Sequence, residues 1–348
     1  MRSGDFKESY GQLVVLARNP VGWVYAAGAV LALSLLPVFA GGYVINLATM
    51  AGIAAIGVLG LNLLCGVAGQ LSLGHAGFLA LGGYAQAILV TDYGVPGWIA
   101  LPLSGAIAAA ASLVVGIPSL RLRGLYLALT TLAFAYIVRH LILISEDITR
   151  GSSGMPVPSL AVAGLRLDQQ AHFYLLVLAL LVAFTLCTLN LMRSKVGRAW
   201  KAIRDHDIAA SAMGISLTRY KLLAFMVSAF YAGVAGALMA LHIRYVNVDN
   251  FSLLLSVEAL AMIIVGGLGR THGAIMGAVF LSLLHEVIRI AFGYGGSALQ
   301  ALLTDRIYEI KEILYGVVIL LFLRLEPEGL AGIWRKTKRF WVKWPLSQ

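Results

Sequence analysis

Residues 43–64 read YVINLATMAGIAAIGVLGLNLL, a stretch long enough to cross a bilayer that contains no charged side chain. An α-helix needs about 20 mostly apolar residues to cross the hydrocarbon core. The rest of the chain has the same character, since 60% of its residues are hydrophobic, 12% are charged and the mean hydropathy is +0.87. Soluble domains average about 45–50% apolar and about 25% charged residues. The composition therefore predicts an integral membrane protein.

Nine further apolar stretches predict an all-α polytopic protein with about ten transmembrane helices. The predicted spans lie near residues 22–40, 43–64, 71–91, 98–117, 120–144, 172–192, 221–243, 253–269, 271–293 and 308–324. This division leaves a cytoplasmic N-terminal segment at 1–21, a transmembrane domain at 22–324 and a basic, aromatic tail at 325–348. Two connections are long, an outer loop at 145–171 and an inner loop at 193–220, so most of the chain is expected inside the membrane.

The distribution of Lys and Arg predicts that both termini are cytoplasmic. Cytoplasmic loops of membrane proteins carry an excess of these residues. With ten spans, 19 of the 26 Lys and Arg residues fall on the cytoplasmic side and 7 in outer loops or spans. The net charge of +10 is therefore interpreted as an orientation signal, to which the tail adds affinity for anionic membrane lipid. Nucleic acid is not predicted as a partner.

A glycine-rich stretch, GVAGQLSLGHAGF at residues 66–78, is unusual for a membrane helix. Interrupted helices at membrane depth mark transport sites, because their freed backbone groups bind polar solutes. The candidate pathway residues in this stretch are Gln70, Ser72, Gly74, His75 and Phe78. An alternative remains open, in which the glycines allow close helix packing and the polar side chains hydrogen-bond between helices.

Ionisable residues within predicted spans are costly and therefore indicate function. Glu258, in the eighth span, is added to the candidate pathway. In the ninth span, a Glu286–Arg289 pair that neutralises itself is favoured over a proton relay. The sequence contains no phosphate-binding loop, no nucleophile or zinc-protease motif and no pattern of metal ligands. It predicts a transport subunit rather than an enzyme, without a metal or cofactor of its own.

The inner loop has the pattern of a short amphipathic helix. Ala199, Ile203 and Met213 belong to an apolar stripe at helical spacing, with basic residues opposite, and Gly214 offers a helix stop. Such a helix needs a surface that covers its apolar face. Either the membrane surface or a cytoplasmic partner would serve.

Several motifs, in one order along most of the chain, resemble a known family. They include GLNLLCGVAGQLSLGHAGFLALGGYA, GRAWKAIRDHDIAASAMGIS, VGGLGRTHGAIMGA and PEGLAGIW. The chain resembles the permease subunits of ABC importers for branched-chain amino acids, most of all the M type. The resemblance implies a pore of two related permeases, two cytoplasmic ATPases that use ATP, an extracytoplasmic solute-binding protein, alternating access, and a place in the bacterial inner membrane.

The resemblance also assigns the inner loop to coupling with an ATPase. The coupling residues that it implies are Gly197, Arg198, Ala199, Ile203, Arg204, Asp205, Met213 and Gly214. Branched-chain or other hydrophobic amino acids are the expected solutes. An ABC permease for urea, short amides or aromatic solutes is an alternative within the class. A secondary transporter that couples ions through Glu258 and the charged cluster near Glu286 is the alternative from another class.

Overall fold

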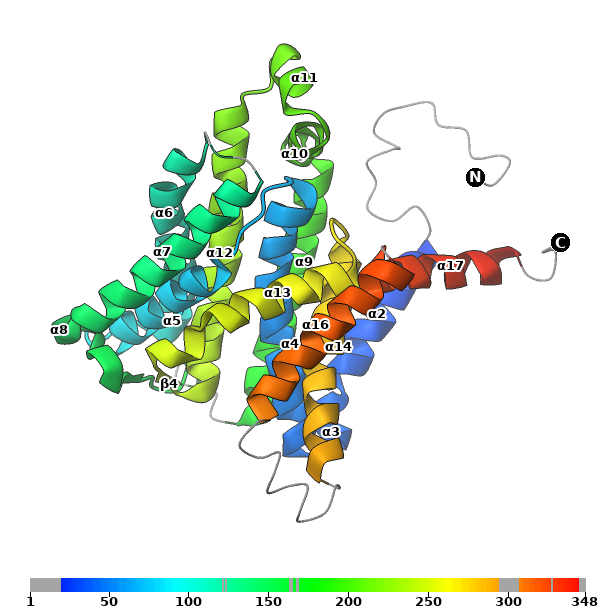
Figure 1. Cartoon of the computed structure of the whole chain (residues 1–348). Helices are drawn as coiled ribbons and strands as arrows, with labels where there is room; N and C mark the ends of the chain where they lie inside the picture. Colours follow the sequence, from blue (N-terminus) through cyan, green and yellow to red (C-terminus); the bar gives the residue numbers. More distant parts are fainter. Residues whose placement is uncertain are drawn as a thin grey trace.

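The structure is a computed structural model that describes residues 20–120, 122, 124–162, 165–166, 169–293, 307–326 and 328–343. Helices make up nearly all of it (Figure 1). The main helices are α2 (Pro20–Ser34), α3 (Leu36–Phe39), α4 (Gly42–Leu61), α5 (His75–Thr91), α6 (Gly97–Ser119), α7 (Leu125–Ile144), α8 (Glu146–Thr149), α9 (Gln170–Arg193), α10 (Lys195–Asp205), α11 (Asp207–Ala212), α12 (Leu217–Ile243), α13 (Leu253–Gly266), α14 (Thr271–Gly293), α16 (Ile307–Leu325) and α17 (Gly329–Lys343).

Short irregular elements complete the described chain. They are a π-helix η1 (Asn62–Val67), two 3-10 turns η2 (Gly151–Ser153) and η3 (Val248–Phe251), and the strands β1 (Met155–Pro156), β2 (Ala161–Val162), β3 (Leu165–Arg166) and β4 (Tyr245–Val246). The strands form two antiparallel pairs, β1 with β4 and β2 with β3. The first pair ties the predicted outer loop to the end of α12.

Six helical segments among the described residues are long and apolar enough to cross a membrane. They are Gly42–Val67, Gly97–Ser119, Leu125–Ile144, Gln170–Arg193, Leu217–Ile243 and Val248–Gly266. A helix also lies in each of the other four predicted ranges. The all-helical class is confirmed, while ten spans and cytoplasmic termini stay predictions.

Two predicted spans begin later than expected. The span predicted from 71 starts as a helix at His75, and that predicted from 120 starts at Leu125. Gly124, directly before α7, has φ +56, a conformation that glycine adopts without the usual steric penalty. The predicted span 22–40 is divided into α2 and α3 by a turn at Leu35.

The long helix α12 packs at the centre of the bundle against α4, α5 and α6. Glycines allow this close packing, since a Cβ atom added to Gly82 of α5 would lie 2.0 Å from the carbonyl oxygen of Gly233 in α12. Small residues let membrane helices approach closely and gain dispersion contacts. Helix α12 runs between α10 and α11 at one end of the bundle and β4 at the other (Figure 1).

Candidate functional site: a helix break, a cavity and a helical hairpin

The glycine-rich stretch breaks the helix, as predicted. Helix α4 continues into the π-helix η1, residues 68–74 have no regular structure, and α5 begins at His75. Side chains from distant helices accept hydrogen bonds from backbone N–H groups at the break. The N–H of Leu73 donates to Thr131 Oγ1 at 2.9 Å, and the N–H of Ala76 donates to Ser256 Oγ at 2.8 Å. Such compensation allows irregular backbone at membrane depth.

The structure separates the predicted pathway residues into two groups. Gln70 and Ser72 are buried, and Gly74 packs against the backbone of Thr131 in α7. The ring of Phe78 packs against that of Phe134, with 4.9 Å between the centroids. Gly74 and Phe78 lie in helix-to-helix contacts, which fits the packing alternative for these two residues.

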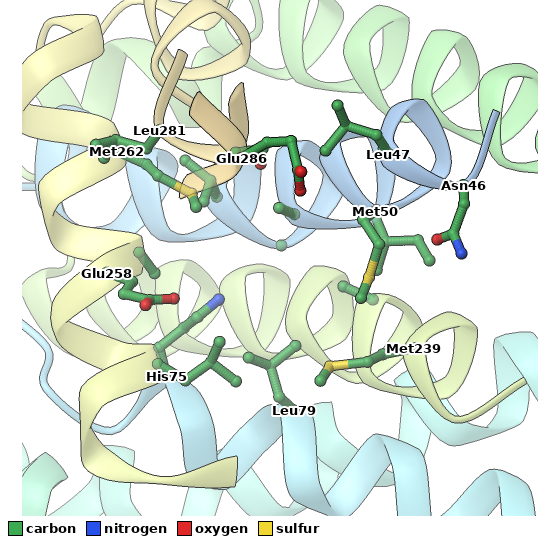
Figure 2. Close-up of a pocket in the computed structure, with 18 of the residues that line it drawn as sticks. Asn46, Leu47, Met50, His75, Leu79, Met239, Glu258, Met262, Leu281 and Glu286 are labelled. Atoms are coloured by element: carbon green, nitrogen blue, oxygen red, sulfur yellow. The ribbon is translucent and has the colours of Figure 1, made fainter. Parts of the chain in front are cut away.

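His75 and Glu258 belong to the second group, because both line one cavity of about 380 Å³ (Figure 2). Residues of α4, α5, α12, α13 and α14 form its walls. The apolar side chains of the wall include Leu47, Met50, Leu79, Met239, Met262 and Leu281. Ligand pockets in proteins typically measure about 300–1,000 Å³ and are mostly apolar with a few polar groups. This cavity therefore suits a small solute with an aliphatic part and a polar part.

Sequence reasoning did not place several polar residues in the cavity wall, among them Asn46 and Glu286. Asn46 had no motif around it, and Glu286 was expected to neutralise Arg289 instead. The carboxylate of Glu286 points into the cavity from α14, opposite Glu258 and His75 in Figure 2. The Arg289 side chain lies outside the described residues, so the predicted pair stays a prediction.

The inner loop forms a hairpin of two helices, α10 and α11, rather than one. Ser194 caps α10 by accepting hydrogen bonds from the N–H groups of Val196 and Gly197. An extended residue, His206, separates the two helices. Trp200 is fully buried, and its Nε1 donates to the carbonyl oxygen of Tyr220 at 2.8 Å. The hairpin is therefore anchored on α12.

The predicted coupling residues lie on different faces of this hairpin. Gly197, Ala199 and Ile203 are buried, whereas Met213 is 86% exposed. Arg198, Asp205 and Gly214 are exposed. Ile203 therefore faces the protein, contrary to its expected place among docking side chains. Ile208, which was not singled out, is 74% exposed and joins Met213 as an apolar side chain open to a partner.

Arg204 connects the hairpin to the helix break. Its Nη1 donates to the carbonyl oxygen of Gly66 at 2.7 Å, and its aliphatic carbons lie beside Gly69. Gly66 in turn touches the backbone of Gly269, whose N–H donates to Asn62 Oδ1 at 2.8 Å. Helix α10, the π-helix and the α13–α14 turn therefore form one contact network.

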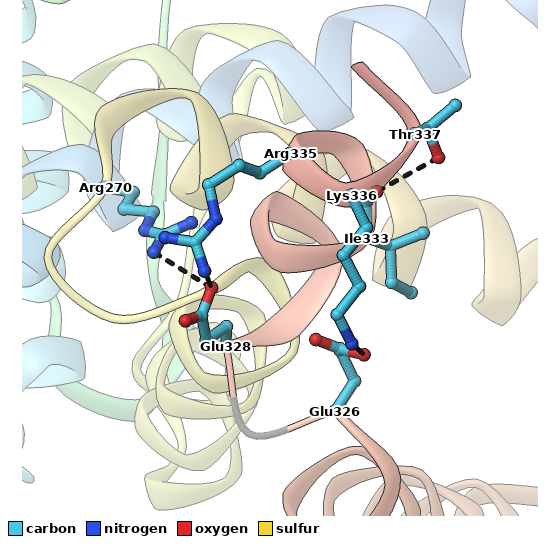
Figure 3. Close-up of polar contacts among 7 residues, drawn as sticks. All are labelled: Arg270, Glu326, Glu328, Ile333, Arg335, Lys336 and Thr337. Carbon is cyan, nitrogen blue, oxygen red and sulfur yellow. Dashed lines mark hydrogen bonds and ion pairs between the residues drawn. The ribbon is translucent and has the colours of Figure 1, made fainter. Parts of the chain in front are cut away.

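A carboxylate extends this network to α17 (Figure 3). Glu328 accepts hydrogen bonds from Arg270, at 3.1 Å, and from Arg335. Hydrogen bonding by Arg335, with the positive charges of Arg335 and Arg270, lowers the pKa of Glu328. Gly267 of the α13–α14 turn also contacts the backbone of Glu328. Helix α17 is thus joined to the turn that contacts η1.

Comparison with known proteins identifies the family. The sequence profile described as "Branched-chain amino acid transport system / permease component" matches residues 43–323. The chain belongs to this family. Its family and its apolar helices are those of a multi-pass protein of the bacterial inner membrane. The match covers the helix break, both cavity carboxylates and the hairpin of α10 and α11.

Curated relatives carry permease names. The chain is 39% identical over 269 residues, 70% of its length, to the "High-affinity branched-chain amino acid transport system permease protein LivM" of Salmonella typhimurium. It is 23% identical over 304 residues to permease protein BraD of Pseudomonas aeruginosa, covering 83% of this chain and 94% of that protein. The alignment covers 63% of the length of the Salmonella relative. No solved structure matches the chain.

Proposed function

We propose that the chain is the transmembrane permease subunit of an ATP-driven importer for branched-chain or other hydrophobic amino acids. The observation that carries the proposal is the cavity of about 380 Å³, which pairs methionine and leucine walls with the carboxylates of Glu258 and Glu286. Carboxylates would attract the ammonium group of an amino acid, and the apolar walls would contact its aliphatic side chain. The family match and the relatives' names support the same solute class.

The proposed mechanism is alternating access driven by partner subunits. Two cytoplasmic ATPases would hydrolyse ATP and move the hairpin of α10 and α11, where Ile208 and Met213 are the exposed apolar side chains. The Arg204–Gly66 hydrogen bond would carry this motion to the helix break that precedes His75. Helix α13, which bears Glu258, is connected through the Gly66–Gly269 contact. A second permease would complete the pore, and an extracytoplasmic binding protein would deliver the solute.

The composition of the cavity ranks the alternatives. Urea and short amides lack the aliphatic part that the methionine walls would contact, and planar aromatic solutes would not use two carboxylates. Glu258 would also serve an ion-coupled secondary transporter, which would work without ATPases. That alternative leaves the exposed apolar side chains of the hairpin without a partner surface.

The test is to isolate the chain, carrying a tag at its C-terminus, from native membranes and to identify co-purifying proteins by mass spectrometry. Two ATPases and a related permease are the expected partners. Vesicles with the purified assembly should then take up leucine only with ATP and the binding protein. A chain that is recovered alone and takes up solute under an ion gradient would contradict the proposal.

A further inference from the structure

Helix α17 is a basic helix that lies across the direction of the membrane helices. Its 15 residues contain no acidic side chain, and its bases are Arg335, Lys336, Lys338, Arg339 and Lys343. In Figure 1 it runs crosswise to α4 and α12 and extends away from the bundle. Because α4 and α12 have the length and apolar character of membrane spans, a helix crosswise to them lies along the plane of the membrane.

The two sides of α17 differ in what they contact. On one side, Ala331 is fully buried beside Gly267 of the α13–α14 turn. On the other, Ile333 is 44% and Trp334 59% exposed, and Lys338, four positions after Trp334, is exposed as well. Residues four positions apart are neighbours on a helix surface. The exposed face of α17, which is defined by Ile333, Trp334 and Lys338, therefore places apolar side chains next to a positive charge.

Two ion pairs link α17 to the segment that precedes it. Lys336 Nζ donates to Glu326 Oε2 at 2.5 Å, and Arg335 donates to Glu328 (Figure 3). These pairs neutralise two of the bases. Among the described residues, Lys338 forms no ion pair. The exposed face of α17 therefore keeps a positive charge that a partner of opposite charge can bind.

These features match a helix that lies on the membrane surface and binds anionic lipid. Tryptophan is enriched where the hydrocarbon core meets the head groups, because its ring is apolar and its N–H is polar. Lys and Arg near this surface are attracted to anionic head groups. The direction of α17 along the membrane plane favours lipid over a protein groove as the surface that covers Trp334.

We propose that the exposed face of α17 binds anionic phospholipid at the membrane surface. Ile333 and Trp334 then lie among the upper parts of the acyl chains, and Lys338 contacts the head-group phosphates. Because Glu328 also accepts a hydrogen bond from Arg270, the bound lipid anchors the α13–α14 turn at the surface. This inference goes beyond the proposed function, since it holds whichever solute the permease carries.

The test is photo-crosslinking of the full chain in nanodiscs that contain equal amounts of phosphatidylglycerol and phosphatidylcholine. The photoreactive amino acid p-benzoylphenylalanine replaces Thr337, which is exposed one turn after Ile333, and mass spectrometry identifies the lipid adducts. Adducts with phosphatidylglycerol should exceed those with phosphatidylcholine by roughly fivefold or more, and high salt should reduce this excess. Lys338→Gln should lower the ratio of the two adducts by roughly fivefold, the factor expected for one base at an anionic surface.

Two controls separate a specific lipid contact from general lipid exposure. Lys201→Gln makes the same charge change at an exposed site of α10 and should leave the adduct ratio unchanged. The photoreactive residue at Val114 of α6, which is 71% exposed, should label the two lipids equally. The same label at Val114 in the Lys338→Gln chain checks that this variant still inserts.

Three results would overturn the proposal. They are equal labelling of the two lipids from position 337 in the wild type, an unchanged ratio in Lys338→Gln, and the absence of lipid adducts at this position. In the importer assembled with its partner subunits, a crosslink from position 337 to an ATPase in place of lipid would assign the exposed face of α17 to a protein partner and would also overturn it.

Discussion

The guanidinium of Arg204 donates a hydrogen bond of 2.7 Å to the backbone carbonyl of Gly66, across 138 positions of the sequence. The bond joins the hairpin of α10 and α11 to the last part of the π-helix, two residues before the helix break. A carbonyl at such a break has no helical partner on one side, so a charged donor is a strong ligand for it. The pair is therefore a point at which hairpin motion reaches the membrane helices.

Arg204→Glu should abolish solute-stimulated ATPase activity while the chain still inserts into the membrane. The substitution removes the donor and places a negative charge beside a carbonyl oxygen. Lys201→Glu, on an exposed part of the same helix, makes the same charge change away from Gly66 and should retain most of the activity. ATPase assays in vesicles, with co-purification of the ATPases as a check on docking, measure both. Normal coupling in Arg204→Glu would refute the proposed link.

Trp200→Ala should loosen the hairpin from α12. The indole is fully buried and hydrogen-bonded to Tyr220, and truncation of such a side chain costs about 3–5 kcal/mol. Limited proteolysis between α9 and α12 should become faster, and the thermal midpoint in detergent should fall. Trp334→Ala, which removes a 59% exposed indole, should change stability by less than about 0.5 kcal/mol. Equal proteolysis rates in the two variants would contradict the anchoring of α10 by Trp200.

Glu258→Gln should reduce leucine uptake by roughly tenfold or more, since a hydrogen bond to a charged group contributes about 1.5–3 kcal/mol. The variant keeps the size of the side chain and removes its charge from the cavity wall. Glu146→Gln, in an exposed short helix away from the cavity, is the control and should transport normally. Initial uptake rates over a range of leucine concentrations measure the effect. Unchanged uptake would assign Glu258 to packing alone.

The α17 contact should be stable to mild acid. The pKa of Glu328 is lowered in the folded chain. The ionised carboxylate therefore stabilises the contact of α17 fully above its ordinary pKa of 4.5, and this stabilisation is lost as the pH falls through the lower pKa of the folded chain. A spin-label distance between α17 and the α13–α14 turn should therefore stay constant from pH 7 to about 5.

Glu328→Gln should lengthen that distance already at pH 7, because the paired charge is gone. Glu326→Gln removes a carboxylate that pairs with Lys336 instead and should leave the contact with Arg270 intact. A distance in Glu328→Gln that equals the wild-type distance would show that Gly267 packing alone holds α17.

Much of this architecture follows from local sequence. The uncharged run at 43–64 forms a membrane helix, and the density of glycines at 66–78 marks where the helix breaks. The spacing of Ala199 and Ile203 correctly predicted helix in the inner loop. These features depend on neighbours within one or two turns, which a single sequence displays.

Features that depend on distant partners could not be predicted. Phe78 and His75 are three positions apart, yet one packs on α7 and the other faces the cavity. The start of α5 is likewise held by a distant residue, because the N–H of Ala76 donates to Ser256 Oγ, 180 positions away. The position of Asn46 could not be predicted for the same reason, because its partner His242 is 196 positions away.

Ser194 has a mechanical consequence. It is the single residue between the last residue of α9 and the first of α10, and its side chain caps the second helix. Because only one residue connects the two helices, a rotation of the hairpin would tilt α9 about this connection. The 24 residues of α9 span about 36 Å, and a tilt of one degree would displace its far end by about 0.6 Å. That end carries Gln170 and Phe173, so a movement of the hairpin would shift these two side chains at the other end of the bundle.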